Sequence, residues 1–235
     1  MVGVAQWLEH QLVELNVAGS SPVAHPKKLG FRHINMTERL SLSQNHLELF
    51  LKEQELPFDV KIAMPSDIGQ LIPLINEAYR YENEGPMAFK NPENLRVDED
   101  SLRKAMEDGF VIGATRKEED EERILGCVQY KEIPPSEGSG SEQDTNAYFG
   151  MLAVNVDLQK QHIGTRMAGL AESIAAFRNR RILEIQVINH SAHLLRWYPK
   201  LGYEEFGRKD WNAPFLTKPT KFVLMKKKIP TDKLS

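Results

Sequence analysis

Residues 148–165 decide the fold, and their sequence is Tyr-Phe-Gly-Met-Leu-Ala-Val-Asn-Val-Asp-Leu-Gln-Lys-Gln-His-Ile-Gly-Thr. The apolar run over residues 147–154 predicts a strand. After a polar turn, apolar side chains recur with helical spacing, which predicts a helix over residues 163–179. The stretch is therefore a strand that passes through a short loop into the N-terminus of a helix.

The N-terminus of this helix is a candidate anion site, because the first backbone N–H groups of a helix are unpaired and carry partial positive charge. Gly164 lets the backbone approach a phosphate closely, the Thr165 hydroxyl adds a hydrogen bond, and Lys160 adds charge at the rim. Many such junctions bind nothing, and the chain contains neither Gly-x-x-x-x-Gly-Lys-Ser/Thr nor Gly-x-Gly-x-x-Gly. The residues alone leave both an anion site and a plain structural junction open.

The rest of the chain supplies the other elements of one α/β domain with a mixed sheet. Pro73 falls inside one helical pattern and predicts an end or a kink there. The charged segment 116–123 predicts an exposed hairpin turn, and residues 82–97 and 134–145 have the composition of loops. The predicted strands are 58–64, 110–115, 124–133, 182–188, 203–206 and 221–227, and the predicted helices are 45–55, 67–81, 98–108 and 192–201.

Composition excludes several classes of protein. The chain has 235 residues, of which 41% are hydrophobic and 27% charged, which is typical of a globular protein. The net charge of −3 argues against broad electrostatic capture of nucleic acid or of an anionic membrane, and the sequence has no apolar run of about 18 residues. Cys127 is the single cysteine, so no intrachain disulfide can form, and its apolar surroundings predict a buried structural thiol. We expect a cytoplasmic protein, with the nucleus left open.

The first 35 residues do not resemble part of the domain. Val4-Ala-Gln-Trp7 and Gly19-Ser-Ser-Pro22 back-translate to codon sets that include the A-box and B-box promoters of a transfer-RNA gene, in the correct order. We therefore expect translated tRNA-like sequence at the N-terminus, with Met36 as the true start. The expected organisation is a non-domain extension over 1–35, a helical lead-in over 36–57 and the folded domain over 58–230.

Leu152-Ala-Val154 followed by Gln159-Lys-Gln-His162-Ile-Gly164 resembles the coenzyme-binding motif of the GNAT family of N-acetyltransferases, Gln/Arg-x-x-Gly-x-Gly/Ala after a strand. The resemblance implies a single domain with a mixed, mostly antiparallel, twisted sheet flanked by helices, and strands splayed at the coenzyme site. It also implies that acetyl-CoA is bound through its pantetheine arm by main-chain groups of Leu152, Ala153 and Val154. The implied pyrophosphate site consists of Gln159, Lys160, Gln161, His162, Ile163, Gly164 and Thr165.

His162 departs from the motif, because it stands in place of the first glycine. If this position needs a positive φ, a histidine there costs about 1 kcal/mol more than a glycine. Its imidazole can instead interact with a phosphate, or it can be an exposed side chain with no role.

Trp197-Tyr-Pro-Lys-Leu-Gly-Tyr203 resembles a second segment of the same family, Phe-Tyr-x-Lys-x-Gly-Phe. Gly202 suits the left-handed residue after a helix end. The resemblance implies that Tyr198 protonates the departing coenzyme A thiolate, a role that suits a phenol with a pKa near 10. The alternative is a tyrosine that only packs. Ser191 stands where many family members have asparagine, which puts that contact in doubt.

No residue pattern identifies the general base. Glu132, Tyr148, Glu184 and His190 are the candidates. The resemblance places acceptor recognition in the loops 82–97 and 208–220. The second loop carries Trp211 and Phe215, which line a pocket or cover the sheet edge.

The expected function is transfer of an acetyl group from acetyl-CoA to a primary amine of a small molecule or peptide by direct nucleophilic attack. One alternative is a non-catalytic acyl-CoA-binding relative, and another is an α/β module that binds a different phosphate ligand. We expect neither a metal nor a nucleic-acid or membrane partner, and a monomer or homodimer.

Overall fold

The structure, a computed structural model, describes residues 36–82, 96–119, 121–133, 146–212, 216 and 218–230. The expectation for residues 1–35 and the loop predictions for 83–95 and 134–145 lie outside the described residues.

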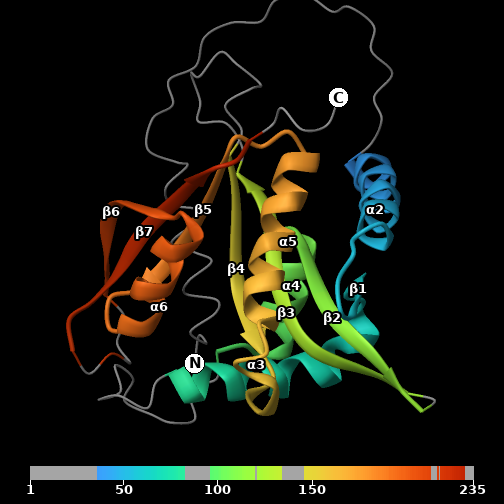
Figure 1. Cartoon of the computed structure of the whole chain (residues 1–235), viewed down its shortest axis with the longest axis horizontal. Helices are drawn as coiled ribbons and strands as arrows, with labels where there is room; N and C mark the ends of the chain where they lie inside the picture. The colour runs from blue at the N-terminus through green and yellow to red at the C-terminus, as the bar shows by residue number, and fades with distance from the viewer. Residues whose placement is uncertain are drawn as a thin grey trace, which may run out of the picture.

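The order of the elements is the predicted one and begins with helix α2 (Figure 1). In chain order they are α2 (Met36–Lys52), β1 (Asp59–Ile62), α3 (Ile68–Glu82), α4 (Glu99–Glu107), β2 (Phe110–Glu118), β3 (Glu121–Ile133), β4 (Asn146–Val154), α5 (Ile163–Phe177), β5 (Ile182–Ile188), α6 (Ala192–Trp197), β6 (Glu204–Trp211) and β7 (Thr220–Lys228).

Several boundaries differ from the predictions. Helix α2 begins at Met36, nine residues before the predicted start at residue 45, and ends at Lys52. Strands β2 and β3 continue to the pair Glu118–Glu121, so the predicted turn 116–123 is too long. The polar residues of this ribbon remain paired because an antiparallel ladder tolerates exposed side chains. Helix α3 continues through Pro73, because Leu71 and Ile75 are fully buried on the core and hold the helix in place.

A further difference affects the segment that carries Tyr198. The predicted helix 192–201 is divided into α6 and a 3-10 turn over Tyr198–Leu201. Pro199 lies in this turn and lacks an N–H group, so it cannot continue the α-helical hydrogen bonds. Strand β6 also runs five residues beyond the predicted end at residue 206, to Trp211.

The sheet has seven strands in the order β1-β2-β3-β4-β5-β7-β6. Every neighbouring pair is antiparallel except β4 and β5. These two parallel strands pair only at Ala147–Leu183 and Tyr148–Glu184. Beyond these pairs the strands part, as Figure 1 shows below the top of the sheet. The expected mixed, mostly antiparallel sheet with splayed strands is thereby confirmed.

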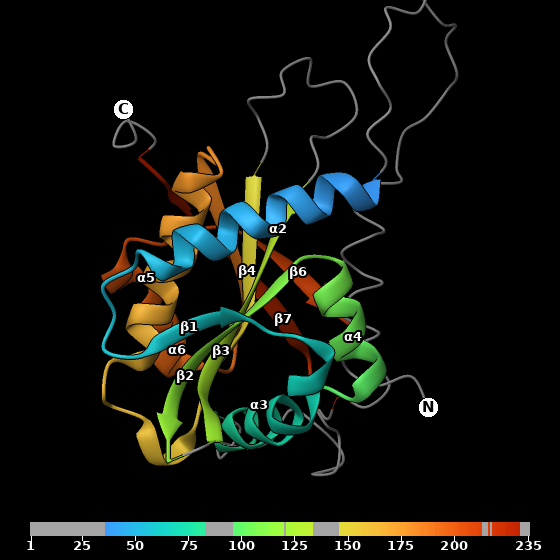
Figure 2. The same cartoon turned by 90° about the vertical axis from the view of Figure 1, so that its right-hand side faces the viewer.

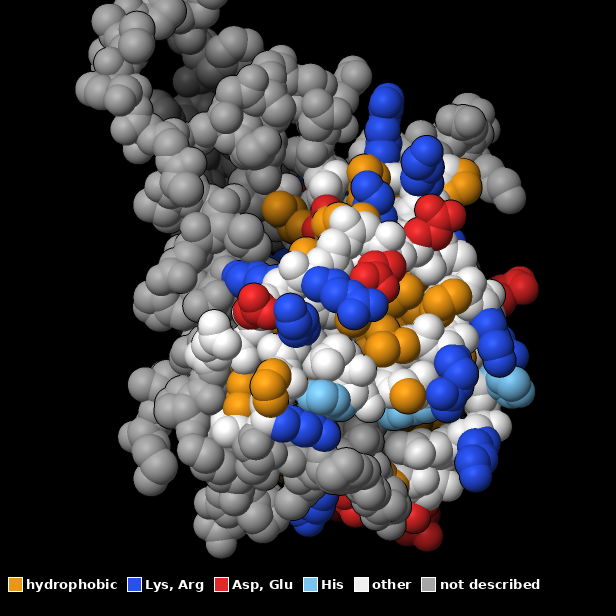
Figure 3. Space-filling model, turned by 90° about the vertical axis from the view of Figure 1, so that its left-hand side faces the viewer, with side chains coloured by type: hydrophobic (Ala, Val, Ile, Leu, Met, Phe, Trp, Pro, Cys, Tyr) orange, Lys and Arg blue, Asp and Glu red, His pale blue; other side chains and the backbone are white. Residues whose placement is uncertain are grey.

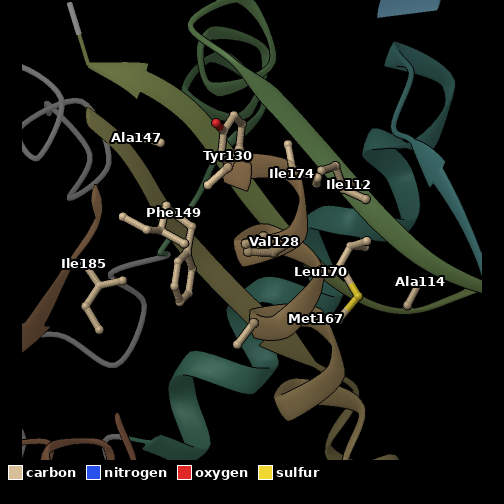
Figure 4. Close-up of a cluster of buried hydrophobic side chains, with 14 of the residues drawn as sticks. Ile112, Ala114, Val128, Tyr130, Ala147, Phe149, Met167, Leu170, Ile174 and Ile185 are labelled. Atoms are coloured by element: carbon tan, nitrogen blue, oxygen red, sulfur yellow. The ribbon is translucent and has the colours of Figure 1, made fainter. Parts of the chain in front are cut away.

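Helices cover both faces of the sheet (Figure 2). On one face α5 packs Met167, Leu170 and Ile174 against Val128 and Phe149 (Figure 4). On the other face α3 and α4 form a second buried cluster with the opposite side of β2, β3 and β4.

Helix α2 contributes to the core on the α5 side. Leu47 and Leu51 are buried in the same cluster as α5. The ring of Phe50 stacks on Phe177 with centroids 4.5 Å apart. The helical lead-in therefore packs on the domain, although its boundary at residue 58 stays a prediction.

A β-bulge in β4 sets the side-chain directions next to the splayed strands. Cys127 pairs with Ala153 and Gln129 pairs with Gly150, so β4 has one more residue than β3 in this interval. Met151 has a φ of 50° at this point. Because of the extra residue, the side chains of β4 exchange faces across the bulge.

Candidate functional site

The space between the diverging strands has a free strand edge on one side. Within the described residues, β4 pairs with β5 only at its first positions, so the edge of β4 from Phe149 to Val154 has no strand partner toward β5. Unpaired N–H and C=O groups on such an edge can bind an extended ligand. Leu152, Ala153 and Val154 lie on this edge, as the pantetheine prediction requires. Ala153 is 2% exposed as a whole residue, whereas its neighbours Leu152 and Val154 are half-buried.

Half-buried apolar side chains lie on both sides of this edge. They belong to β4 and the loop after it, and to α6 and the turn that follows it. All of them pack against the α5-side core without being fully covered by it, so an apolar ligand arm would complete their burial. They are Leu152, Val154, Leu158, Leu194, Leu195, Trp197 and Leu201. Figure 3 shows the face that carries β6, β7 and α6, where apolar side chains lie among Lys and Arg side chains.

The N-terminus of α5 has no side-chain cap. Its N-cap residue is His162, and the first N–H group that bonds within the helix is that of Arg166, which donates to the His162 carbonyl at 3.0 Å. The N–H groups of Ile163, Gly164 and Thr165 precede this bond and point toward the loop. They form the kind of site at which anions bind.

Two residues of the loop have left-handed backbone. His162 has a φ of 62° and Lys160 has a φ of 64°. Residue 162 therefore does have a positive φ, and a histidine is less favourable there than the glycine of the motif. The side chains of Gln159, Lys160, Gln161 and His162 are all exposed at the rim of the helix N-terminus.

Gly164 is not required by the packing of the chain. A Cβ at this position would lie 3.6 Å from a methyl group of Val154, which is an ordinary contact, and the φ of Gly164 is not positive. The absence of a side chain instead leaves room for a group from outside the chain, next to the uncapped N–H groups. The Thr165 side chain is half-buried beside it.

Tyr198 lies across the gap from β4. It is 7% exposed, and its ring centroid is 6.1 Å from that of Phe149 and 5.6 Å from that of Tyr203. The turn that holds it ends at Gly202, whose φ of 89° and N–H bond to Pro199 O form the left-handed cap predicted from the sequence. The structure thus brings Tyr198 beside the strand that carries the predicted pantetheine residues.

A polar cluster fixes this turn to α5. The Tyr203 hydroxyl donates to Glu172 at 3.1 Å, and the Lys227 ammonium donates to the other oxygen of Glu172 at 2.6 Å. Burial raises the pKa of Tyr203, and the adjacent Glu172 carboxylate raises it further. The sequence gives no signal for this cluster, because its members come from three distant segments.

The four base candidates have very different surroundings. Glu132 is held by ion pairs to Arg178 at 2.7 Å and Arg180 at 2.6 Å. His190 is exposed and its Nε2 contacts the carbonyl of Pro219 at 3.1 Å. Both carboxylate oxygens of Glu132 are thus occupied by arginines, and His190 follows the end of β5 that lies away from the β4–β5 pairs.

Tyr148 and Glu184 form the last β4–β5 pair before the strands part. The Tyr148 ring covers Gly150, since a Cβ on Gly150 would lie 2.5 Å from the hydroxyl oxygen. Burial raises the pKa of Glu184, while the amide of Asn146, which donates to it at 2.7 Å, and the charge of Lys226 lower it. These two candidates are the ones that adjoin the gap.

Other predicted residues have structural roles. The Cys127 thiol is fully buried and donates to the Met151 carbonyl in the bulge at 3.7 Å, and burial raises its pKa to about 12. Trp211 is 1% exposed and stacks on Phe222, so it covers the sheet, whereas Phe215 lies outside the described residues. Ser191 is the buried N-cap residue of α6 and makes no side-chain cap hydrogen bond. None of the described helices is long and apolar enough to cross a membrane.

A free strand edge beside an uncapped helix N-terminus defines an α/β protein that can hold an extended ligand with an anionic end. Residues 74–203 match the family described as the Acetyltransferase (GNAT) family. Because this match spans more than half of the 235 residues, the chain belongs to the GNAT acetyltransferase family. No curated protein sequence matches the chain.

Solved structures with a similar fold include N-acetyltransferases. The ribosomal-protein-alanine N-acetyltransferase from Brucella melitensis is 18% identical, with 72% of this chain and 98% of that chain covered and a TM-score of 0.53. NAA60 from Arabidopsis thaliana, in complex with a bisubstrate analogue, is 15% identical, with 73% and 98% covered and a TM-score of 0.57. The NatB acetyltransferase complex bound to CoA and MES is 12% identical, with 73% and 99% covered and a TM-score of 0.54. At these identities the likeness concerns the fold.

Proposed function

We propose that this GNAT protein transfers an acetyl group from acetyl-CoA to a primary amine of a small molecule or peptide by direct nucleophilic attack. The observation that carries the proposal is the continuity of the free β4 edge with the uncapped N-terminus of α5, with Tyr198 facing the same gap. Proteins of similar fold whose names give alanine as the group acetylated, the ribosomal-protein-alanine N-acetyltransferases, support the reaction class.

Acetyl-CoA fits this arrangement by its chemistry. Its pyrophosphate is an anion, which suits the N–H groups of residues 163–165 and the open space at Gly164. Its pantetheine arm contains amide groups that can pair with main-chain groups of Leu152, Ala153 and Val154. The distance along β4 from Val154 to Gly150 is about 13 Å, so an extended arm that enters at α5 reaches the bulge.

In the proposed reaction the neutral amine attacks the thioester carbonyl carbon, a C–N bond forms and the C–S bond breaks. Tyr198 donates its proton to the departing thiolate and is reprotonated from solvent. Glu184 accepts the proton that the amine loses, through water, because it adjoins the gap and its raised pKa strengthens it as a base.

Two measurements test the proposal. Calorimetry with acetyl-CoA measures coenzyme binding, and thiol release with a panel of primary amines measures turnover. We expect binding of acetyl-CoA and amine-dependent thiol release. Binding without turnover on any amine would favour a non-catalytic acyl-CoA-binding protein, and failure to bind acetyl-CoA would favour a different phosphate ligand.

The remaining expectations belong to the same proposal. The expected location is cytoplasmic, in keeping with a chain whose single cysteine, Cys127, is buried. The acetyltransferase domain is assigned to residues 58–230, with 36–57 as a packed lead-in. We expect a monomer or homodimer.

A further inference from the structure

Beside the gap, the described residues of β5 and β7 are less buried on the sheet face opposite α5 than on the α5 face. On the α5 side the residues of β5 and β7 are buried in the core, as Val187 and Val223 illustrate. On the opposite face Glu184, Gln186 and Leu224 are only half-buried. The hydroxyl of Tyr148 also lies on this face, above the bulge at Gly150. This is the open surface next to the proposed position of the thioester.

Arg96 and its neighbour Val97 are both in contact with α3. The buried Asn76 side chain accepts from the N–H of Val97 and donates to the carbonyl of Val97, both at 2.9 Å. The guanidinium carbon of Arg96 lies 5.1 Å from the centroid of the Tyr79 ring. Fixed backbone on one side and an aromatic ring on the other restrict where the guanidinium can point.

The charge of Arg96 acts on the groups that surround the bulge. Burial raises the pKa of Tyr148 and of Cys127, and the positive charge of Arg96 opposes the shift in both. The Tyr148 hydroxyl lies above Gly150, and the Cys127 thiol contacts Met151. Tyr79, whose ring lies under the Arg96 guanidinium, packs against the buried cluster that contains Met151 and Ala153, so Arg96 lies on the same face of the sheet as these residues of β4.

Within the described part of the chain, Arg96 forms no ion pair, although it is half-buried. The planar guanidinium of Arg96 is half-buried, and an anionic ligand with two oxygens can form paired hydrogen bonds with it. Lys131, 5.3 Å from the Tyr148 ring centroid, and Lys226, opposite Glu184 across the strands, add positive charge to this face. The surrounding segment 190–230 has nine Lys and Arg against three Asp and Glu, although the whole chain is negative.

Glu184 supplies the opposite charge on the same surface. Its carboxylate is held by Asn146 at 2.7 Å and stands beside Tyr148 in the last pair of β4 and β5. A carboxylate near the amine position and a guanidinium near the bulge together match a ligand that has an ammonium group and an anionic group close to one another.

We propose that the acceptor carries a carboxylate close to its primary amine and that Arg96 binds this carboxylate. The inference rests on the proposed acetyl transfer and narrows its acceptor class. The carboxylate can belong to a free amino acid or to an acidic side chain at the start of a peptide, and the two sources are separated by experiment.

The test compares acceptors that differ only in charge. One arm uses a free amino acid and its amide, and the other uses peptides that begin with Asp and with Asn. For the wild-type protein we expect kcat/KM to be at least ~10-fold higher for the carboxylate member in one of the two arms. Arg96→Gln should remove most of this preference and leave the rate with the neutral member within about 2-fold. Arg96→Lys should restore part of it, because the charge returns without the planar fork.

The control is Arg123→Gln, an equivalent change at an exposed arginine near the tip of the β2–β3 hairpin. It should leave the preference intact, and acetyl-CoA affinity should be the same in all variants. An equal rate with charged and neutral acceptors in the wild type, or an equal loss with both in Arg96→Gln, would overturn the inference while leaving acetyl transfer intact. Absence of turnover with every amine would instead overturn the proposed function, and with it this acceptor class.

Discussion

The left-handed backbone of His162 provides a quantitative test of the coenzyme loop. With a φ of 62° this residue carries the strain of an L-side chain in the left-handed region, about 1–2 kcal/mol. His162→Gly removes that strain, but it also increases the freedom of the unfolded chain, which costs roughly 0.5–1 kcal/mol. The expected net change is a stabilisation of about 0.5–1 kcal/mol, or a Tm increase of roughly 1–4 °C for a chain of this length.

Two matched variants separate backbone strain from side-chain effects. Lys160→Gly, at a φ of 64°, should also stabilise the fold, whereas Gln161→Gly, which has no positive φ, should destabilise it. Stability is measured by thermal and denaturant unfolding, and acetyl-CoA affinity by calorimetry. If the His162 imidazole has no role in binding, His162→Gly keeps or improves the affinity. Lower stability in His162→Gly would refute the strain argument, and weaker coenzyme binding would show that the imidazole contacts a phosphate.

Three further changes probe the site. Gly150→Ala places a methyl group 2.5 Å from the Tyr148 hydroxyl oxygen, so it should lower the free energy of unfolding by about 1–3 kcal/mol and remove most of the turnover. The control Gly169→Ala, which has open space in α5, should leave the stability unchanged or raise it. Unfolding experiments and rate measurements on both variants test this. Tyr203→Phe removes the hydroxyl bond to α5 and should cost about 1 kcal/mol in unfolding experiments while acetyl-CoA affinity stays the same; an unchanged Tm would contradict this. Burial raises the pKa of Glu184 in the folded protein above its value in the unfolded chain. Glu184 therefore contributes to the free energy of unfolding at a pH below its unfolded pKa, and this contribution is lost as the pH rises through its folded pKa. Denaturation of Glu184→Gln at several pH values between about 4 and 7 should show this dependence removed, and an unchanged pH profile would disprove it.

Much of the fold follows from local patterns. The continuous apolar run at residues 182–188 and the helical spacing after residue 163 give β5 and α5 within two residues of their ends. Helix α4 begins one residue after the predicted start at residue 98, and Asp98 is its N-cap, with its side chain accepting from Ser101 N at 2.9 Å. These elements are specified by neighbouring residues, so the sequence contains the information directly.

The elements that sequence patterns miss depend on contacts between distant segments. The bulge at Met151 appears only when β3 and β4 are paired, because it is a mismatch between two strands. Helix α3 passes through Pro73 because buried neighbours outweigh the lost hydrogen bond.

The residues of the candidate site also form two groups, those that the sequence identifies and those that only the structure identifies. The motif residues around His162 and Tyr198 are contiguous in sequence and could be named from it. Glu172 and Arg96 have no such signature, because their relation to the site comes from packing across helices and strands. Glu132 is excluded as the general base by its ion pairs with two arginines, which only the structure reveals.

The most direct test of the central claim is the rate of thiol release from acetyl-CoA in Tyr198→Phe compared with the wild type, with acetyl-CoA affinity measured in parallel. The phenol oxygen is the only atom removed, so the buried ring should still pack against Phe149. The account predicts that kcat falls at least ~10-fold, within the range for loss of a general acid, while coenzyme affinity changes by less than about 2-fold. An unchanged kcat with bound acetyl-CoA would contradict the assignment of Tyr198 and of the gap beside it as the catalytic centre.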